Sequence, residues 1–262
     1  MFLMTDIELD IINQNIYDNI EELLPENEII SFLNEGSKRI RSKLAILYIK
    51  ANNKDLDDSV YKMLTACELI HNASLLHDDV IDGSEIRRGV TTIGNKYSPK
   101  ISILCGDYVV SKAIEMLLEL NNNTISGIFN KCVNNMAKAE VSQYFLRNKI
   151  PTTEEYISIC KGKTGGLFSA VLESCAVYHN LDRKLASKFG EIFGICFQMK
   201  NDIEEYSANE DNKNKIFTAK DIIGIENAVI LSDNYKQELR ELLVSFSDNK
   251  YKLDLESLID EL

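Results

Sequence analysis

Hydrophobic residues recur with helical spacing along nearly the whole chain, and no stretch alternates apolar and polar residues for long enough to predict a sheet. The pattern contains neither an internal repeat nor a domain linker, so we expect one all-α domain over residues 1–262 with about ten or more helices. The main helices are predicted over residues 5–23, 28–50, 56–82, 101–120, 124–148, 153–178 and 182–206, and two or three shorter ones follow residue 219.

Helix caps and breaks agree with several of these boundaries. Thr152 and Glu155 have the spacing of a capping box at the start of one predicted helix, and Asp182 can cap the next one. Glycine and proline mark a substantial loop over residues 83–99, and a very polar stretch marks a second loop over residues 207–215.

Charge narrows the range of functions. The chain has 29 Lys and Arg against 41 Asp and Glu, a formal charge of -12, which repels nucleic acid. A small polyanionic substrate would also be repelled, so its binding would need a local cluster of cations, bound metal ions, or both. The six cysteines form no C-x-x-C pair, and no apolar run approaches the roughly 18 residues of a membrane span. We therefore expect a cytoplasmic protein without stable membrane insertion, whose cysteines are reduced.

A narrow acidic stripe follows the helix predicted over residues 56–82. At about 100° per residue, Glu68, His71, Asp78 and Asp82 fall within a sector of about 80° on an otherwise apolar helix. Carboxylates one turn apart in a low-dielectric site cannot all stay ionised without a cation. A hard divalent ion such as Mg²⁺, which binds a few carboxylates together with substrate phosphates, would satisfy them. The alternative is a solvated acidic helix end before a loop.

A second polar stripe makes the metal interpretation stronger. It lies on the helix predicted over residues 182–206 and consists of Glu191, Gly194, Gln198, Asn201, Asp202 and Glu205. Two core helices that each carry acids on one side can face each other across a cavity and hold metal ions between them. Such an architecture suits a diphosphate ligand.

Cations gather in three compact groups, each of which has solvated surface as its alternative explanation. The groups are Lys38, Arg39 and Arg41; Arg87 and Arg88; and Lys161 and Lys163. Gly165 and Gly166 interrupt a strong helix beside the third group, which predicts either local unwinding near a phosphate or tight helix packing. His71 has two interpretations, a core histidine bonded to Glu68 or to a carbonyl group, or a phosphate contact.

Taken in order, these motifs resemble the trans-isoprenyl diphosphate synthases, also called polyprenyl synthetases. The resemblance runs through about residues 35–206 and is specific because six motifs occur in the family's order. They are Gly36 to Arg41, Glu68 to Asp82, Arg87 to Gly89 with Gly106 and Asp107, Glu140 with Gln143, Lys163 with Thr164, and Phe197 with Gln198. The resemblance implies an all-α bundle of isoprenoid synthase type around a deep central cavity, usually as a homodimer.

The resemblance also implies a reaction, the 1'-4 head-to-tail trans condensation of isopentenyl diphosphate with an allylic diphosphate and the release of diphosphate. By position it assigns to isopentenyl diphosphate Lys38, Arg41, His71 and Arg88. It assigns to the allylic diphosphate Arg87, Lys163, Thr164 and Gln198. Small residues at Ala73 and Ser74, where the family uses bulky side chains to stop elongation, imply a product of C20 or longer.

For metal binding the resemblance implies two or three Mg²⁺ ions bound together with the substrate diphosphate. The implied ligands are Asp78, Asp82, Asp202 and Glu205, and the implied catalytic residues are Asp78, Asp82, Arg87, Lys163 and Asp202. This chain departs from the family pattern at Ser37, at Asn201 and Glu205 in the second acidic motif, and at Ile216, where a lysine is usual. Candidates to replace that lysine are Lys213, Lys215 and Lys220.

Three other interpretations stay open from the residues alone. The weakened second acidic motif and the short chain fit a non-catalytic or weakly active subunit of a heteromeric prenyl synthase. Asn201 and Asp202 also fit the start of the second metal motif of class I terpene cyclases, but Glu205 and Asn209 stand where a hydroxyl residue and an acid belong. A purely structural helical scaffold would explain the periodicity but not the two polar stripes.

Overall fold

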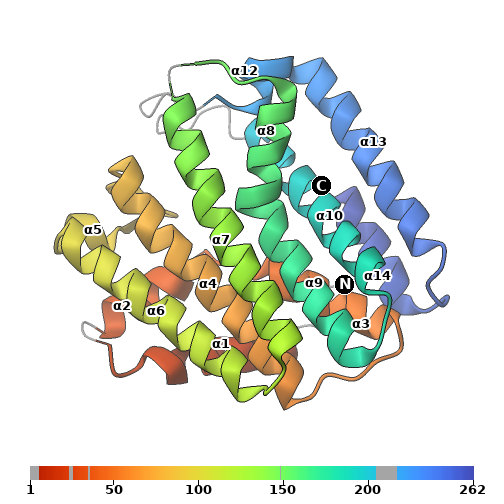
Figure 1. Cartoon of the computed structure of the whole chain (residues 1–262), viewed down its shortest axis with the longest axis horizontal. Coiled ribbons are helices and arrows are strands. Elements are labelled where there is room, and N and C mark those ends of the chain that lie inside the picture. The colour runs from red at the N-terminus through yellow and green to blue at the C-terminus, as the bar shows by residue number, and fades with distance from the viewer. Residues whose placement is uncertain (1–5, 24–25, 35, 148, 205–216) are drawn as a thin grey trace. The chain divides into compact units, whose positions relative to one another are not determined.

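A computed structural model describes residues 6–23, 26–34, 36–147, 149–204 and 217–262. The residues group into two compact units. The first unit comprises Met1–Ile46 and Leu56–Ser126, and the second comprises Leu47–Asp55 and Gly127–Leu262. Apart from one two-stranded ribbon, the regular elements of the described residues are all helices, which confirms the predicted all-α class (Figure 1).

The first unit is built on two long helices that pack together. Its elements are α1 (Asp6–Ile20), α2 (Glu26–Asn34), the first part of α3 (Ile40–Ala51), α4 (Asp58–Asp82), α5 (Ile93–Lys96) and α6 (Pro99–Glu119), with β1 (Ile86–Arg87) and β2 (Val90–Thr91) paired antiparallel. α4 and α6 lie side by side (Figure 1). Gly106 of α6 lies against the ring of His77 of α4, since a Cβ at Gly106 would lie 2.3 Å from His77 Nε2.

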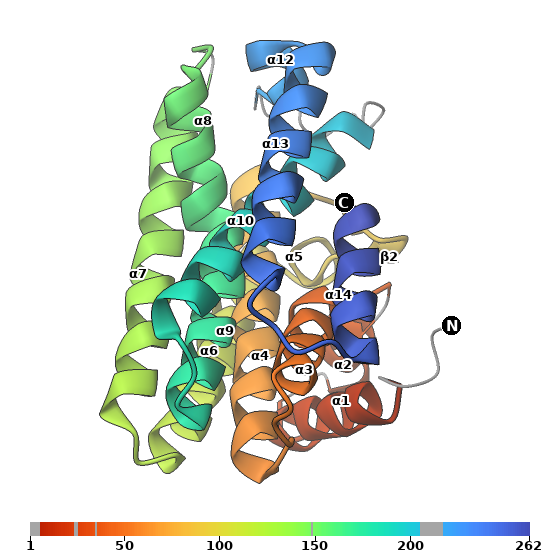
Figure 2. The ribbon, with the colours of Figure 1, turned by 90° about the vertical axis from the view of Figure 1, so that its right-hand side faces the viewer.

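The second unit is centred on α10. Its elements are α7 (Asn123–Leu146), which begins in the first unit, α8 (Thr153–Cys160), the π-helix η1 (Lys161–Gly165), α9 (Gly166–His179), α10 (Arg183–Glu204), α12 (Ala219–Ile223), α13 (Ile225–Leu243) and α14 (Lys250–Asp260). α10 packs against α9 and α13, and Figure 2 shows α13 running alongside α10. Phe168, Phe189 and Phe193 are fully buried in this packing.

Local signals explain several boundaries. The predicted capping box is present, since Thr152 Oγ1 accepts from the Glu155 amide and Glu155 Oε2 accepts from the Thr152 amide. Asp182 caps α10 by accepting from two amides of its first turn, as expected. α6 begins at Pro99, two residues earlier than predicted, because the Ser98 side chain caps it and proline fits the first turn.

One predicted helix is wrong as a single element. Residues 28–50 form α2 and α3, which are separated by left-handed backbone at Gly36 (φ +59°) and Arg39 (φ +45°). A helix cannot pass through such conformations. The predicted span 153–178 is also subdivided, because η1 separates α8 from α9.

Among the residues that the structure describes, no helix combines the length and the apolar character needed to span a membrane.

Candidate active site

A basic cluster in the first unit surrounds His71. We define it as Arg39, Arg41, Arg87 and Arg88, whose charges all act on the imidazole. The cluster comes from three places in the chain: the turn before α3, the first turn of α3, and the β1–β2 ribbon. The structure therefore brings together two of the three cationic groups that the sequence singled out.

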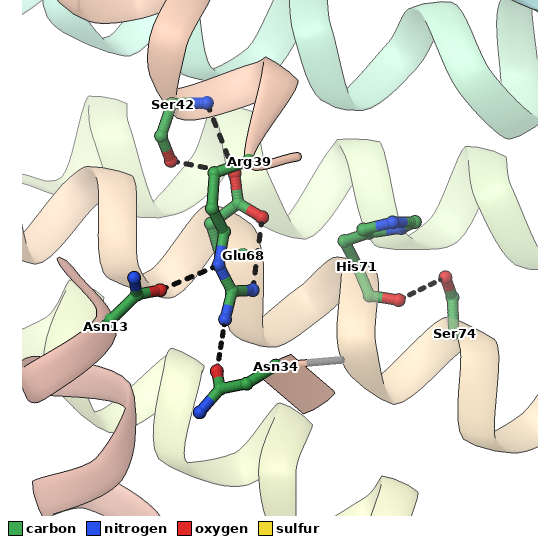
Figure 3. A network of polar contacts seen from close by, with 7 residues as sticks. All are labelled: Asn13, Asn34, Arg39, Ser42, Glu68, His71 and Ser74. Atoms are coloured by element: carbon green, nitrogen blue, oxygen red, sulfur yellow. Dashed lines mark hydrogen bonds and ion pairs between the residues drawn. The ribbon is translucent and has the colours of Figure 1, made fainter. Parts of the chain in front are cut away.

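Arg39 is the structural member of this cluster. Its side chain is 4% exposed and lies 3.6 Å from Glu68 Oε2 through Nη1, while Nε donates to Asn13 Oδ1 at 3.0 Å (Figure 3). Glu68 also accepts from the amide and hydroxyl of Ser42, so its carboxylate ties α4 to the first turn of α3. Burial of both ions is balanced by these bonds, which fix the start of α3.

Arg87 is held by an acid of the first aspartate-rich motif. Arg87 Nε donates to Asp79 Oδ1 at 2.6 Å, and the Asp79 side chain is 1% exposed. This charge-assisted bond holds the Nε edge of the guanidinium group against Asp79. Asp79 therefore positions Arg87, a role that the sequence did not predict.

Arg88 and Lys38 have no hydrogen-bond or ion-pair partner among the described residues, and both side chains are exposed. Arg88 has left-handed backbone (φ +51°), and its side chain packs over Gly36, where a Cβ would lie 3.2 Å from Arg88 Cδ. The pKa of Arg88 is lowered by partial burial first and then by the other guanidinium groups of the cluster. A bound anion would relieve that repulsion.

His71 is neutral in this setting. Its pKa is held well below the ordinary value of 6.5, first by burial and then by the four arginines of the basic cluster. Glu68 is engaged by Arg39 and Ser42, and the backbone carbonyl group of His71 accepts from Ser74 Oγ (Figure 3). The imidazole is therefore a neutral hydrogen-bonding group beside a positive cluster.

Asp78 and Asp82 lie one turn apart at the C-terminal end of α4, and both are partly buried. α4 is capped at both ends, by the Asp57 side chain and by left-handed Gly83, so its last turn is well defined. Ala73 is buried and Ser74 is partly buried on the preceding turn. The first unit thus places Asp78 and Asp82, together with the two predicted chain-length residues, along one helix.

In the second unit, Lys163 lies in η1 and bonds to α7. Its Nζ is 2.6 Å from Glu140 Oε2 and donates to Gln143 Oε1 at 3.0 Å. Lys161, two residues earlier, pairs instead with Glu191 of α10 at 3.0 Å. The two lysines therefore contact different neighbouring helices.

Tight packing explains the glycines around η1. A Cβ at Gly162 would lie 2.6 Å from the Ala139 side chain, and one at Gly165 would lie 2.9 Å from the Glu191 carbonyl oxygen. Gly194 of α10 approaches the Gly165 backbone equally closely. These contacts support tight helix packing, one of the two sequence-based alternatives, and the helix widens locally into a π turn at η1. An approach of this segment to a phosphate stays a prediction.

The second polar stripe faces α8 and η1. Thr164 Oγ1 donates to Gln198 Oε1 at 2.8 Å, and Gln198 Nε2 donates to Asp202 Oδ1 at 2.8 Å. Asp202 Oδ2 accepts from Tyr156 Oη at 2.7 Å and from the Ala219 amide at 3.0 Å. This chain of bonds runs from η1 through α10 to α8 and the start of α12.

Burial raises the pKa of Asp202, and its three hydrogen-bond donors oppose that rise. Removing a carboxylate from water disfavours its charged form, whereas donors favour it. A cation at Asp202 would act in the same direction as the donors and stabilise the ionised carboxylate.

The donor chemistry of these acids fits Mg²⁺. Among the residues described, no group of three or more His, Cys, Asp or Glu side chains is close enough to hold a metal ion by itself. Mg²⁺ commonly binds through one or two carboxylates and completes its shell with water and substrate phosphate. Asp78 and Asp82 supply carboxylates of that kind on α4, and Asp202 supplies one on α10.

Several predicted positions lie outside the described residues. They are the metal ligand Glu205, the departure at Ile216, and the candidate lysines Lys213 and Lys215. Lys220 is described and lies in the first turn of α12.

Sequence reasoning missed two residues that hold the predicted site residues in place. Asp79 was the neighbour of a predicted ligand, and its burial gave it a different partner. Tyr156 carried no motif signal, since its role depends on a contact 46 residues away in the sequence. Glu140 and Gln143 were family landmarks without an assigned partner, and the structure gives them Lys163.

Comparison with known protein families agrees with these motifs. The family model described as Polyprenyl synthetase matches residues 25–252, which is most of the chain and includes parts of both units. The chain belongs to the polyprenyl synthetase family. The alternatives of a cyclase and of an unrelated helical scaffold do not account for this match.

Curated proteins similar to this chain include named prenyl diphosphate synthases. An octaprenyl diphosphate synthase from Haemophilus influenzae is 31% identical over 212 residues, 79% of this chain and 64% of that protein. A geranylgeranyl diphosphate synthase from Methanosarcina mazei is 31% identical over 237 residues, 82% of this chain and 72% of that protein. The chain spans less than two thirds of the length of several relatives: 64% of the Haemophilus influenzae protein, 43% of a decaprenyl-diphosphate synthase from Dictyostelium discoideum and 62% of a prenyl transferase from Cyanidium caldarium.

Solved structures of polyprenyl synthetases share the fold. A heptaprenyl diphosphate synthase from Staphylococcus aureus has a TM-score of 0.91 at 22% identity, covering 100% of this chain and 98% of that one. A polyprenyl synthase from Caulobacter crescentus, solved with calcium and isoprenyl diphosphate, has a TM-score of 0.90 at 24% identity and covers 98% of this chain and 94% of that one. These likenesses confirm the isoprenoid synthase fold.

Proposed function

We propose that the chain is a Mg²⁺-dependent prenyl transferase that condenses isopentenyl diphosphate with an allylic diphosphate and releases diphosphate. The observation that carries the proposal is the basic cluster around neutral His71, in a chain whose formal charge is -12. Gathering four guanidinium groups raises their mutual repulsion, so the arrangement is favourable when a polyanion binds there. Membership of the polyprenyl synthetase family supports a diphosphate as that polyanion.

The cations near His71 differ in how far protein carboxylates already neutralise them. Glu68 and Asp79 neutralise Arg39 and Arg87, whereas Arg88 and Lys38 lack a partner among the described residues. We assign Lys38, Arg41, His71 and Arg88 to isopentenyl diphosphate. Neutral His71 can donate or accept one hydrogen bond there, and the cations match the phosphate charge.

The allylic diphosphate is assigned to Arg87 and to the η1 region. Lys163, Thr164 and Gln198 are already ordered by bonds to Glu140, Gln143 and Asp202, which lowers the entropy lost when a substrate binds. Asp78 and Asp82, with Asp202 and Glu205, are assigned to Mg²⁺. When bound, Mg²⁺ neutralises the charge that develops on the departing diphosphate.

The protein side chains have their own task in the proposed reaction. Arg87 and Lys163 stabilise negative charge on the leaving diphosphate, so that an allylic cation can form. Lys38, Arg41 and Arg88 hold the second substrate so that its double bond attacks C1 of that cation. The bound diphosphate then removes the proton. Because water would quench the cation, the reaction requires a substrate that is shielded from solvent.

The proposal also covers product length, oligomeric state and cellular location. Small, partly or fully buried Ala73 and Ser74 support a product of C20 or longer. A homodimer is supported by four exposed apolar side chains on one side of α6, namely Ile103, Leu104, Ile114 and Leu118. A cytoplasmic location is consistent with six buried free cysteines.

The test of this proposal is the substitution Asp78→Ala. It removes one acid from the last turn of α4, so we expect turnover to fall by about two orders of magnitude or more, as for loss of other charge-stabilising groups. The helical circular dichroism signal should be unchanged. Asp233→Ala, at an exposed position of α13, is the control and should keep wild-type activity. Near-normal turnover in Asp78→Ala would contradict the assignment of this acid to Mg²⁺.

A further inference from the structure

The carboxylate of Asp202 is unusually well fixed for a proposed metal ligand. Oδ2 accepts from Tyr156 Oη at 2.7 Å and from the Ala219 amide at 3.0 Å, and Oδ1 accepts from Gln198 Nε2 at 2.8 Å. The three donors come from α8, α12 and α10, so three elements converge on one side chain.

The number of acceptor positions makes this arrangement informative. An ionised carboxylate offers about four lone-pair positions, two on each oxygen. Both positions of Oδ2 are used by Tyr156 and Ala219, and one position of Oδ1 is used by Gln198. Counted over donors from the described residues, one acceptor position remains, and it is on Oδ1. While Oδ2 keeps both donors, a cation bound at Asp202 would be held through Oδ1.

We propose that Tyr156 is a positioning residue that, with the Ala219 amide, fixes Asp202 so that only Oδ1 binds Mg²⁺, through its remaining acceptor position. The inference deepens the proposed function and rests on it. Tyr156 contacts neither the metal nor the substrate in this assignment, and it acts through Asp202.

The surroundings of Tyr156 suit this role. Its side chain is 5% exposed and packs in a small apolar cluster with Cys160, Met199 and Ala219. The capping box at the start of α8 fixes the first turn, which carries Tyr156 at its end. The hydroxyl group is therefore held by packing on one side and by Asp202 on the other, with little rotational freedom to lose.

The same network connects Asp202 to the residues assigned to the allylic diphosphate. Gln198 uses its amide nitrogen for Asp202 and its amide oxygen for Thr164, so both ends of its side chain are committed. A rotation of the Asp202 carboxylate would break the Gln198 bond as well. Partners of this kind, one step removed from a metal, commonly contribute about 10-fold to 100-fold in metal affinity or activity.

The experiment measures metal-dependent ligand binding instead of turnover. An unreactive thiolo analogue of an allylic diphosphate is titrated into the full chain by calorimetry at a series of Mg²⁺ concentrations. Tyr156→Phe keeps the ring and removes the hydroxyl donor to Oδ2. We expect it to raise the Mg²⁺ concentration for half-maximal analogue binding about 10-fold, while the affinity at saturating Mg²⁺ recovers to the wild-type value.

A matched control separates this effect from the loss of any buried hydroxyl group. Tyr48→Phe removes the hydroxyl of a tyrosine that is 1% exposed and packs against Phe189 and Phe246 in the same unit. It should keep the wild-type Mg²⁺ requirement. Thermal melting of both variants shows whether either has lost its fold.

A second variant covers the case in which Tyr156→Phe does not fold. Ala219→Pro removes the other donor to Oδ2 at the first residue of α12, a helix position that tolerates proline. A wild-type Mg²⁺ requirement in whichever folded variant is measured overturns the inference, provided that the wild type itself binds the analogue with Mg²⁺. If the wild type binds no analogue at any Mg²⁺ concentration, the proposed function fails instead, and the inference falls with it.

Discussion

Asp78 and Asp79 are neighbours in the sequence, but a helix turns about 100° between them and gives them different surroundings. Asp79 is buried against Arg87, whereas Asp78 is partly exposed on the stripe that also carries Asp82. An aspartate pair in an acidic motif therefore contains one acid that orients an arginine and one that we assign to metal. Solvent exposure distinguishes the two acids, because Asp79 is buried and Asp78 is partly exposed.

Asp79→Asn tests the orienting role. The substitution keeps the shape but removes the charge that holds Arg87 Nε at 2.6 Å. A loss of about 1.4 kcal/mol in substrate binding corresponds to a tenfold change, so we expect KM for the allylic diphosphate to rise about tenfold. Steady-state kinetics measures this. The unfolding free energy should also fall by about 1.5–3 kcal/mol, because a buried charged hydrogen bond is lost.

A comparison variant separates orientation from general destabilisation. Asp233→Asn removes an exposed aspartate of α13 and should leave both KM and stability unchanged. If Asp79→Asn loses stability but keeps the wild-type KM, then Asp79 supports the fold and does not orient Arg87 for substrate.

His71 predicts a specific dependence of stability on pH. Its pKa is held well below 6.5 in the folded protein, so below about pH 6.5 the unfolded chain binds a proton that the folded chain does not. The unfolding free energy should therefore fall as pH falls through that window, by about 1.4 kcal/mol per pH unit from this group. Urea denaturation of the wild type and of His71→Gln at several pH values measures the difference. Parallel pH profiles for the two proteins would contradict the neutral imidazole.

At the scale of elements, η1 shows how a helix irregularity and close packing occur together. Gly165 in η1 and Gly194 in α10 approach so closely that a Cβ at Gly194 would lie 2.5 Å from Gly165 Cα. Thr164 is thereby brought within hydrogen-bond distance of Gln198. The contact of η1 with α10 orders two residues that we assign to the allylic diphosphate.

Gly194→Ala should consequently destabilise the protein by about 1–3 kcal/mol, because the new methyl group meets backbone atoms that cannot move aside easily. Gly127→Ala, in α7 with nothing within 4 Å of its ideal Cβ, is the matched comparison. It should stabilise the protein by about 0.5–1 kcal/mol, as expected for alanine in place of a helical glycine. If urea denaturation gave the same change in the free energy of unfolding for both substitutions, the α10–η1 contact would be looser than described.

The sequence predicted the helices well because the apolar period of each long helix is continuous, as in α4 and α10. The prediction failed at residues 28–50, because apolar residues keep the helical period across a break in the helix. Left-handed backbone at Gly36 and Arg39 makes that break. The partners of Asp79 and Tyr156 were not predictable for another reason. Each pairing depends on which face of a helix is buried and on contacts distant in sequence, which periodicity alone does not give.

For the whole molecule, the main electrostatic problem is that the chain and its proposed diphosphate substrates are both negatively charged. A chain of formal charge -12 would repel a diphosphate unless cations or metal ions are concentrated where it binds. The structure concentrates four arginines around His71 in the first unit, and in the second unit it places Lys163 beside Thr164, whose hydroxyl group bonds Gln198. We propose that both features bind the diphosphate groups of a prenyl transfer reaction, a proposal supported by the polyprenyl synthetase family match over residues 25–252.

The most direct test is to incubate purified wild-type protein alone with isotopically labelled isopentenyl diphosphate, allylic primers of several lengths and Mg²⁺, and to size the products. We predict Mg²⁺-dependent incorporation of label into chains of C20 or longer, with one diphosphate released per bond formed and no partner protein required. Absence of labelled product with every primer, from protein that remains folded, would contradict the account and return the chain to the role of a dependent subunit.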